Sequence, residues 1–348
     1  MHHRGRFRGA QARQPRAVPA QARAGRGLVR ARRLLLLGAL GTAIVVGASC
    51  GGASPTPVPS PQPLPSAEPV RLPTIAAAGD IVCAPGSRDP CRHLQTLAVV
   101  ETLAPDLVLP LGDNQYETGS ESEYATAYNL SWGRVRAISR PVPGNHEYQE
   151  DPTARGYFDF FNGPGALTGI AGERDKGYYS YTVGDWHLVA LNSNCGAIRG
   201  GCAVNSPQER WLRQDLQENK RPCTLAYAHH PRFSSGINGS SANLTPLWQA
   251  LYEYGADVYL CGHDHHYERF APQRPDGTSD PEHGLREFVV GTGGRSITPF
   301  RTILANSEIQ DTTSFGVLAL RLAPTSYEWK FLASAGMPLA DSGTGACH

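Results

Sequence analysis

Acidic residues are missing from the start of this 348-residue chain, and the first one is Glu68. Residues 1–33 instead carry ten arginines, and an apolar run follows over residues 34–46. That run is shorter than the ~20 apolar residues that a membrane-spanning helix needs. A basic stretch, a short apolar core and small residues before Cys50 are typical of an export signal, which we predict for residues 1–50.

Two details of this leader bear on how it is processed. Arg32 and Arg33 directly precede the leucines, a weak twin-arginine pattern that would suit a protein folded around metal before export. Residues 47–50, Gly-Ala-Ser-Cys, are similar to a bacterial lipoprotein cleavage box, but Gly47 stands where an aliphatic residue is usual. Lipidation of Cys50, plain cleavage and retention as an anchor all stay open. We expect an extracytoplasmic bacterial protein, secreted or lipid-anchored to the cell envelope, that meets the membrane only through this signal or a lipid.

Basic residues are scarce in the rest of the chain. Residues 51–73 contain eight prolines, one at every second position from Pro55 to Pro65, which predicts an extended, semi-rigid linker. Residues 74–348 then contain 21 lysines and arginines against 30 acidic residues, a formal charge of −9. Binding to nucleic acid is disfavoured, because contacts to phosphates require a basic stripe on the surface. This part is long enough for one sizeable core, and no internal repeat is visible.

The eight cysteines favour an oxidising compartment. Cys50 belongs to the leader, so the other seven leave at least one unpaired thiol. Three pairs are candidates for disulfides: Cys83 with Cys91, Cys195 with Cys202, and Cys223 with Cys347. Cys261 lies in an apolar stretch and is expected to be the free thiol, although connectivity does not follow from sequence.

Apolar strands alternate with helical patterns from Thr74 onward. Strands up to Ala78 and over residues 107–111 flank a helical apolar face, which predicts a βαβ unit with parallel strands. Residues 178–191 predict a hairpin around Gly184-Asp185. Further helices are expected over residues 124–138, from a capping box at residues 206–209 and from Thr245-Pro246, and further strands at residues 287–290, 317–322 and 327–332. The pattern predicts an α/β fold, a four-layer αββα sandwich of two mixed sheets packed face to face with helices outside.

Polar residues follow five predicted strands, mostly after a glycine; these strands cover residues 75–78, 107–111, 141–143, 225–228 and 258–261. The five segments are Gly79-Asp80, Gly112-Asp113-Asn114-Gln115-Tyr116, Gly144-Asn145-His146-Glu147, His229-His230 and Gly262-His263-Asp264-His265-His266. Ligands of α/β sheets gather beyond the carboxyl ends of the strands. Carboxylate and amide oxygens combined with imidazole nitrogens suit Zn, Mn and Fe, and one carboxylate can bridge two ions. Any single residue could merely cap a strand, but five such segments in one chain indicate a pair of metal ions.

These motifs together resemble those of the calcineurin-like metallophosphoesterases, over about residues 74–300. Tyr116, three residues after Asp113, and the Tyr-Glu-Arg of residues 267–269 make the chain most similar to purple acid phosphatases, although Val82 stands where those enzymes usually have glycine. The resemblance implies two metal ions, iron with iron, zinc or manganese, in a catalytic domain over residues 74–348. One ion would be held by Asp80, Asp113, Tyr116 and His265, and the other by Asp113, Asn145, His229 and His263, so that Asp113 bridges them.

The resemblance also implies roles for the neighbouring residues. A hydroxide shared by two ions ~3.5–4 Å apart can attack phosphorus, with His146 as the general acid for the leaving group. His230, His266 and Arg232 are candidates for binding the substrate, and Arg295 is a further candidate for a phosphate clamp. Glu147 and Asp264 are expected to orient imidazoles. The competing interpretations are that Tyr116 only packs, that both histidines point away and that both arginines are structural. No role is expected for His93, His187, His283 or His348.

The expected activity is therefore hydrolysis of small phosphate monoesters outside the cytoplasm, for phosphate scavenging. A phosphodiesterase or nucleotidase with the same metal centre is one alternative. A catalytically silent, envelope-tethered binding module is another, but such a module would be expected to have lost ligands, and every expected ligand is present.

Overall fold

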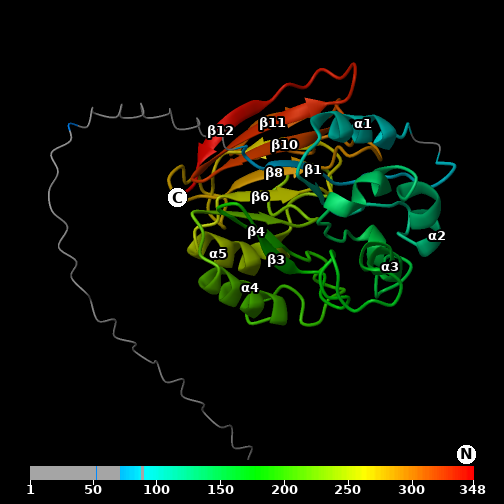
Figure 1. Ribbon diagram of the computed structural model, residues 1–348, viewed down its shortest axis with the longest axis horizontal. Helices are drawn as coiled ribbons and strands as arrows, with labels where there is room; N and C mark the ends of the chain where they lie inside the picture. Colours follow the sequence, from blue (N-terminus) through cyan, green and yellow to red (C-terminus); the bar gives the residue numbers. More distant parts are fainter. Residues whose placement is uncertain (1–51, 53–70, 88–89) are drawn as a thin grey trace, which may run out of the picture. The chain divides into compact units, whose positions relative to one another are not determined.

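Two mixed β-sheets form the framework of the computed structural model, which describes residues 52, 71–87 and 90–348 (Figure 1). In the five-stranded sheet, β1 (Thr74–Ala78) pairs parallel with β2 (Leu107–Pro110) and antiparallel with β10 (Gly316–Ala323). The antiparallel pairing continues through β11 (Ser326–Ala333) to β12 (Ser342–Ala346). The sheet order is therefore β12-β11-β10-β1-β2.

The seven-stranded sheet has the order β3-β4-β5-β6-β8-β7-β9. Its parallel centre consists of β4 (Trp186–Ala190), β5 (Cys223–Tyr227), β6 (Val258–Cys261) and β8 (Arg286–Val290). Antiparallel pairs are added at its two sides by β3 (Tyr179–Val183), β7 (Tyr267–Phe270) and β9 (Ser307–Asp311).

The predicted export signal, including Cys50, and most of the predicted linker lie outside the described residues. Within the part that the structure does describe, no helix combines the length and the apolar character needed to cross a membrane. The described residues from 71 onward belong to one compact unit.

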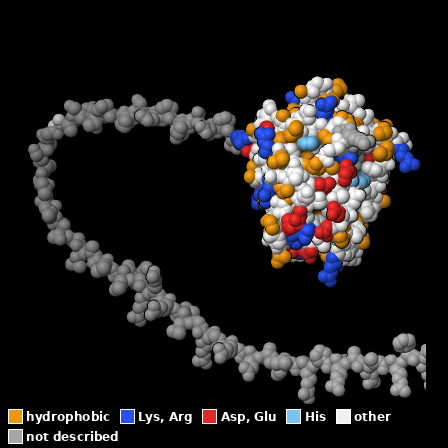
Figure 2. All heavy atoms as spheres, turned by 90° about the vertical axis from the view of Figure 1, so that its right-hand side faces the viewer, with side chains coloured by type: hydrophobic (Ala, Val, Ile, Leu, Met, Phe, Trp, Pro, Cys, Tyr) orange, Lys and Arg blue, Asp and Glu red, His pale blue; other side chains and the backbone are white. Residues whose placement is uncertain are grey.

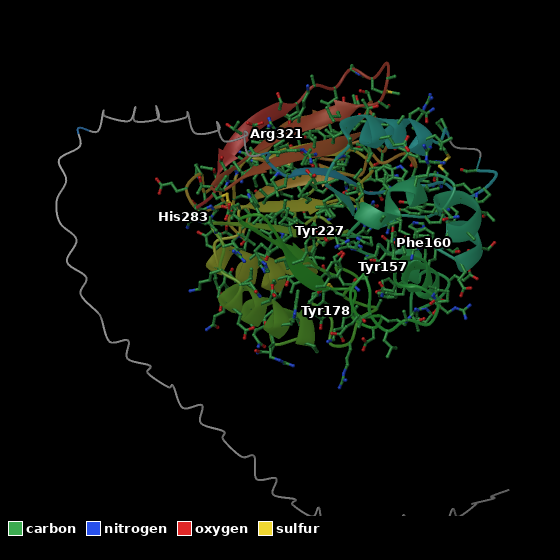
Figure 3. All side chains as sticks on the ribbon, viewed as in Figure 1. Tyr157, Phe160, Tyr178, Tyr227, His283 and Arg321 are labelled. Carbon is green, nitrogen blue, oxygen red and sulfur yellow. A yellow bond between two sulfur atoms is a disulfide. The ribbon has the colours of Figure 1, made fainter. Side chains whose placement is uncertain are left out.

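The core lies between the two sheets, and alternate residues of the central strands separate it from the outer layer. Leu188, Leu225 and Leu260 point inward, toward side chains of the five-stranded sheet such as Ile75 and Leu318. Their neighbours Val189, Ala226 and Tyr259 point outward and pack under the helices. This period of two is what a sheet buried on both faces requires. In Figure 3, Tyr227 of β5 lies in this interior, whereas His283 lies at the periphery.

Helices cover the outer faces. α4 (Pro207–Glu218) begins where the Ser206 hydroxyl accepts a hydrogen bond from the Glu209 N–H (3.2 Å), as the capping sequence predicts. With α5 (Thr245–Glu253) it packs Leu212, Leu247 and Trp248 onto the seven-stranded sheet. α1 (His93–Leu103) lies on the five-stranded sheet, and two shorter helices, α2 (Glu121–Glu123) and α3 (Arg155–Asn162), lie beside the ends of the strands. The predicted αββα sandwich is confirmed.

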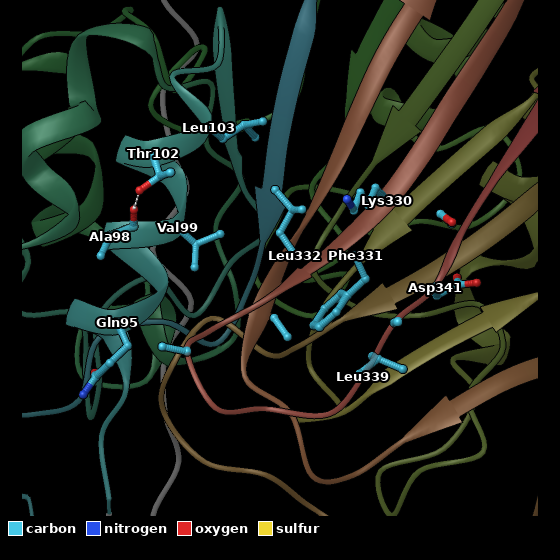
Figure 4. A pocket seen from close by; sticks show the side chains of 14 residues that line it. Gln95, Ala98, Val99, Thr102, Leu103, Lys330, Phe331, Leu332, Leu339 and Asp341 are labelled. Atoms are coloured by element: carbon cyan, nitrogen blue, oxygen red, sulfur yellow. Dashed lines mark hydrogen bonds between the residues drawn. The ribbon is translucent and has the colours of Figure 1, made fainter.

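A groove of about 630 Å³ remains between α1 and the five-stranded sheet (Figure 4). Val99 and Leu103 of α1 line one side, and Phe331, Leu332 and Leu339 line the other. None of the predicted site residues lines this groove.

Two local expectations differ from the structure, and two strands were not predicted. Residues 141–143 form only an isolated parallel bridge beside β2, with the Val142 N–H donating to the Pro110 carbonyl (3.0 Å), because proline on either side lacks the N–H that a longer ladder needs. Residues 124–138 form a π-helical turn followed by a 3₁₀ helix rather than one α-helix. The polar or glycine-rich strands β9 and β12 carry no apolar alternation, so their sequences gave no strand signal.

The three candidate disulfides are present, joining Cys83 to Cys91, Cys195 to Cys202 and Cys223 to Cys347. Cys261 is buried and free, as predicted. The surface is mixed in charge. On the face shown in Figure 2, acidic side chains gather and basic ones are scattered.

Candidate metal centre

The carboxyl ends of strands from both sheets bring the predicted ligands together. Asp80 and Asp113 follow β1 and β2 of the five-stranded sheet, and His229 and His263 follow β5 and β6 of the seven-stranded sheet. Possible ligand atoms of Asp80, Asp113 and His229 all lie within 4.8 Å of one another. Packing the two sheets face to face therefore joins two pairs of strand ends into one cluster.

The first predicted ligand set converges on the Tyr116 hydroxyl. This oxygen lies 2.8 Å from Asp80 Oδ1, 3.0 Å from Asp113 Oδ2 and 3.0 Å from His265 Nε2. His265 Nε2 is in turn 3.2 Å from Asp80 Oδ1, and its Nδ1 lies 2.7 Å from the Ser296 hydroxyl. All four side chains of the set thus meet at one point, including Tyr116, for which simple packing was the competing interpretation.

The second predicted set converges on His229 Nε2. That nitrogen lies 3.3 Å from Asp113 Oδ2, 3.1 Å from Asn145 Oδ1 and 3.2 Å from His263 Nδ1. Asp113 Oδ2 belongs to both sets, which is the position of a bridging ligand. The main chain ties the sets together as well, because the His263 N–H donates to Asp80 Oδ2 (2.8 Å).

The donor set fits a pair of cations. His229 Nδ1 lies 3.0 Å from the Leu111 carbonyl, which can only accept, so Nδ1 carries a proton. In the neutral ring, Nε2 then presents a lone pair toward the lone pairs of Asp113 Oδ2. Two facing acceptors need a proton or a cation between them, and a backbone carbonyl behind the imidazole is the usual support of a metal-binding histidine.

The pKa values of three side chains in the cluster are shifted by burial and by neighbouring charges. Burial opposes ionisation of Asp113, but His229 and His146 hold its pKa well below the usual range. Burial would lower the pKa of His229, but Asp113 outweighs it and raises this pKa to about 9. Burial, followed by the charges of Asp113 and Asp80, raises the pKa of Tyr116 well above its usual value. Tyr116 therefore keeps its proton unless a cation displaces it.

Three of the predicted ligands occupy strained backbone positions. Asp80, Asp113 and His263 have φ values of 59°, 45° and 70°, in the left-handed region that side chains other than glycine rarely adopt. Each such residue costs on the order of 1–3 kcal/mol and persists only where its surroundings hold it. Glycine is required beside them: a Cβ on Gly144 would lie 2.0 Å from Asp113 Oδ1, and one on Gly112, where φ is 85°, would lie 2.6 Å from His229.

His146 lies at the edge of the cluster, where a substrate can reach it. Its side chain is 24% exposed, and its ring packs 4.4 Å from the ring of Tyr116. The Glu117 carbonyl contacts Nδ1, and Nε2 lies 3.9 Å from Asp113 Oδ2. The main chain of His146 also contacts the predicted bridging ligand, because its N–H donates to Asp113 Oδ1 (2.9 Å).

His230 lies on the other side of the cluster, with its ring 4.3 Å from that of His263. The Ser193 oxygen accepts from the His230 backbone N–H (2.9 Å) and lies 2.8 Å from His230 Nδ1, so Ser193 holds both the main chain and the ring of His230. Burial, aided by His229 and His263, lowers the pKa of His230 well below its usual value, so the ring is neutral. The sequence had not pointed to Ser193, which lies in a loop without a motif.

Two predicted substrate-binding residues are not brought to the cluster. His266 is fully buried, with Nε2 3.3 Å from Glu268 Oε2. Arg232 donates to the Pro275 carbonyl (2.8 Å) and stacks on Phe233. His266 is the neighbour of His265, and adjacent residues at a strand end point in opposite directions. Arg232 lies three residues beyond His229, and its side chain turns to the Pro275 carbonyl instead. A substrate-binding role is not supported for either residue.

The remaining predicted residues have definite places. Arg295 pairs with Glu117 (2.6 Å) and lies over the ring of Tyr116, at the rim of the cluster. Asp264 and Glu147 were expected to orient imidazoles, but their hydrogen bonds go elsewhere. Asp264 accepts from the Asn238 N–H (3.0 Å), and Glu147 accepts from backbone N–H groups. Burial and the charge of Asp113 raise the pKa of Glu147 to about 7. The four histidines without a predicted role have other contacts: His93 lies beside the Cys83–Cys91 disulfide, His187 pairs with Asp215, and His283 and His348 contact each other.

The fold and the cluster define a class of two-sheet proteins that hold a pair of metal ions at their strand ends. Residues 73–267 match the family model of the calcineurin-like phosphoesterases, and the chain belongs to that family. The predicted resemblance is confirmed, and the family implies a binuclear metal centre.

Individual relatives place the chain near the purple acid phosphatases. It is 28% identical to human acid phosphatase type 7 over 227 residues, which are 56% of this chain and 50% of that protein. It is also 28% identical to Arabidopsis thaliana purple acid phosphatase 15 over 229 residues, 56% of this chain and 40% of that protein. The structure of purple acid phosphatase PPD1 from yellow lupin superimposes with a TM-score of 0.66 at 20% identity, covering 79% of this chain and 54% of that one. The chain thus spans about half the length of these relatives.

Proposed function

We propose that this chain is an exported phosphatase that hydrolyses phosphate monoesters at a binuclear metal centre. The observation that carries the proposal is the shared position of Asp113 Oδ2, which lies 3.0 Å from the Tyr116 hydroxyl and 3.3 Å from His229 Nε2. Asp80, Tyr116 and His265 would hold one ion with Asp113, and Asn145, His229 and His263 the other. We propose iron with iron, zinc or manganese as the pair, because tyrosine, carboxylate and imidazole donors suit these metals.

When bound, two such cations acidify a water molecule and neutralise the charge of a phosphoryl group. The residues of the chain supply the rest of the proposed chemistry. His146 is partly exposed at the edge of the cluster and would donate a proton to the leaving oxygen. His230, whose ring is held by Ser193 and packs on His263, would donate a hydrogen bond to a phosphoryl oxygen through Nε2. Arg295, held over Tyr116 by Glu117, remains a candidate for contact with the ester.

Export is part of the proposal. Three disulfides among the described residues favour an oxidising compartment, in agreement with the signal-like leader. The proposed partner is a small phosphate ester outside the cytoplasm. The relatives named as acid phosphatases support this substrate class, but the chain covers only about half of each of them, so their activity is carried here as a proposal.

A phosphodiesterase or nucleotidase would use the same cluster, and an assay on both kinds of ester distinguishes these activities from a phosphomonoesterase. The full-length chain should be stripped of metal, reloaded with Fe, Zn or Mn, and assayed on an aryl phosphate monoester and the matching diester. We expect hydrolysis only after reloading, with the monoester preferred by at least about tenfold in kcat/KM. A preference for the diester would favour the alternative enzyme. A loaded protein that hydrolyses neither ester would favour the silent binding module and end the phosphatase proposal.

A further inference from the structure

Glu147 is buried among hydrogen-bond donors although it contacts none of the proposed ligand side chains. Its carboxylate is 1% exposed. Oε2 accepts from the N–H groups of Asp113 (3.0 Å) and Gly144 (2.6 Å). Oε1 accepts from the N–H groups of Asn114 (2.9 Å) and Gln115 (3.3 Å) and from the Tyr124 hydroxyl (3.0 Å). One carboxylate thus satisfies four backbone N–H groups from two separate loops.

Three of these N–H groups are consecutive in the chain, at residues 113–115. They follow two left-handed positions, Gly112 at φ 85° and Asp113 at φ 45°. Successive N–H groups that turn around such positions form a concavity that binds anions. Here the concavity is filled by Glu147, three residues after the glycine of the second loop.

A second hydrogen bond joins the same loops, and here the donor is in the second loop and the acceptor in the first. The His146 N–H, next to Glu147, donates to Asp113 Oδ1 (2.9 Å). This leaves Asp113 Oδ2 directed at Tyr116 and His229. The absence of a side chain at Gly144 lets the two loops approach, because a Cβ there would overlap Asp113 Oδ1. The backbone and the carboxylate of Asp113 are thus both fixed by the segment 144–147.

We propose that Glu147 is a positioning residue for the bridging ligand: its carboxylate fills the concavity of residues 113–115 and so holds Asp113 in the strained conformation that aims Oδ2 between the two metal positions. The proposal rests on the binuclear centre proposed above. Without an anion, three buried N–H groups would be left unpaired, which is unfavourable. The loop would relax and turn the bridging oxygen away.

The substitution Glu147→Gln tests this directly, because the amide keeps the size of the side chain but places an NH₂ group against N–H donors. In the metal-stripped, full-length chain, we expect Mn²⁺ binding measured by electron paramagnetic resonance to weaken about 10- to 100-fold. Hydrogen–deuterium exchange of the peptide 111–118 should become faster in the same metal-free protein. The matched control is Tyr124→Phe, which removes one of the five donors and leaves the backbone concavity filled, so its Mn²⁺ affinity should stay within about threefold of wild type.

Glu147→Asp is the second variant and serves if Glu147→Gln does not fold. It keeps the charge, but the side chain is one methylene shorter and cannot reach the N–H groups of both Asp113 and Gly144. Weakened Mn²⁺ binding in a folded Glu147→Asp protein supports the proposal. Wild-type Mn²⁺ affinity together with unchanged exchange of peptide 111–118, in either folded variant, overturns it.

The failure of the proposed function would look different. A wild-type protein that binds fewer than two Mn²⁺ ions and hydrolyses no aryl phosphate contradicts the binuclear centre, whatever residue 147 is. The exchange measurement needs no metal, so it still decides whether Glu147 holds the loop of Asp113.

Discussion

The two ends of the central strands carry different kinds of residues. At its carboxyl end, β5 leads to His229, and the neighbouring strands lead to Asp80, Asp113 and His263, three residues with left-handed backbones. At its amino end, β5 starts at Cys223, which forms a disulfide with Cys347. There Asp257, just before β6, accepts from the N–H groups of Thr224 (2.8 Å) and His348 (2.9 Å).

Backbone strain and buried charge lie at the carboxyl ends of the strands, whereas a disulfide and a hydrogen-bonded aspartate lie at the amino ends. We expect the strained backbones of the predicted ligands and the adjacent carboxylates at one end to reduce stability in the absence of metal, as is common at functional sites. The disulfide and the paired Asp257 at the other end tie the end of the chain to the seven-stranded sheet. Substitutions at the carboxyl ends should therefore change activity, and substitutions at the amino ends should change stability.

The largest expected effect is at Asp113. Asp113→Asn removes the charge shared by the two ligand sets, and we expect hydrolysis of an aryl phosphate to fall by at least about 10²–10³-fold, the scale of losing one electrostatic contact to a transition state. Steady-state kinetics of the metal-loaded protein measures this. Asp185→Asn, in the exposed hairpin turn, is the matched control and should keep wild-type turnover. Near-normal turnover by Asp113→Asn would contradict the claim that the carboxyl ends of the strands carry the activity.

The disulfide at the amino ends should matter for stability only. Replacing both Cys223 and Cys347 by serine opens a loop spanning 124 residues, and we expect the free energy of unfolding to fall by about 5 kcal/mol. The double serine variant of Cys195 and Cys202, seven residues apart, should lose about 2 kcal/mol less than that. Denaturant titration gives both values. Well below its melting temperature, the Cys223/Cys347 variant should retain wild-type kcat, and a large loss of kcat would show that the two ends are not independent.

The contribution of Glu287 to stability should depend on pH. This β8 carboxyl is fully buried, and burial, partly opposed by the backbone N–H groups of Arg232 and Phe233 and the Cys261 thiol, raises its pKa to about 8. A carboxyl with a raised folded-state pKa contributes stability that is fully present below the unfolded pKa, near 4.5, and is lost as the pH rises to about 8.

Glu287→Gln cannot ionise, so its stability relative to wild type should rise across that window by on the order of 3–5 kcal/mol. Urea unfolding at pH 5 and pH 8 measures the change. The exposed Glu282→Gln should show no such rise. Equal pH profiles for Glu287→Gln and wild type would contradict the assignment.

The smallest expected effect is at Ser193. Ser193→Ala removes the hydroxyl that contacts Nδ1 of His230, and we expect KM for an aryl phosphate to rise about fivefold with little change in kcat, the worth of about one hydrogen bond. Initial-rate kinetics resolves the two constants. Ser279→Ala, at an exposed position, is the control. An unchanged KM would leave His230 without a role in binding the ester.

The convergence of the seven metal-ligand candidates was predictable, because six of them follow apolar strands and Asn145 follows a short parallel bridge beside β2. The sandwich was predictable from the order of parallel and antiparallel segments. The positions of His266 and Arg232 were not, because motif membership does not say toward which side a residue points. Ser193 and the actual contacts of Glu147 were missed because they depend on loops that approach through space and carry no pattern of their own.

The sequence by itself determined which atoms can bind metal, since carboxylate, amide, phenol and imidazole groups are chemical properties of single residues. It also determined the alternation that separates the core from the outer layer. Only the tertiary structure decided that strand ends of two different sheets meet, that Asp113 Oδ2 is common to both ligand sets and that a buried glutamate holds that loop. The physical reason is that these relations are distances between segments far apart in the chain, and they exist only once both sheets have packed.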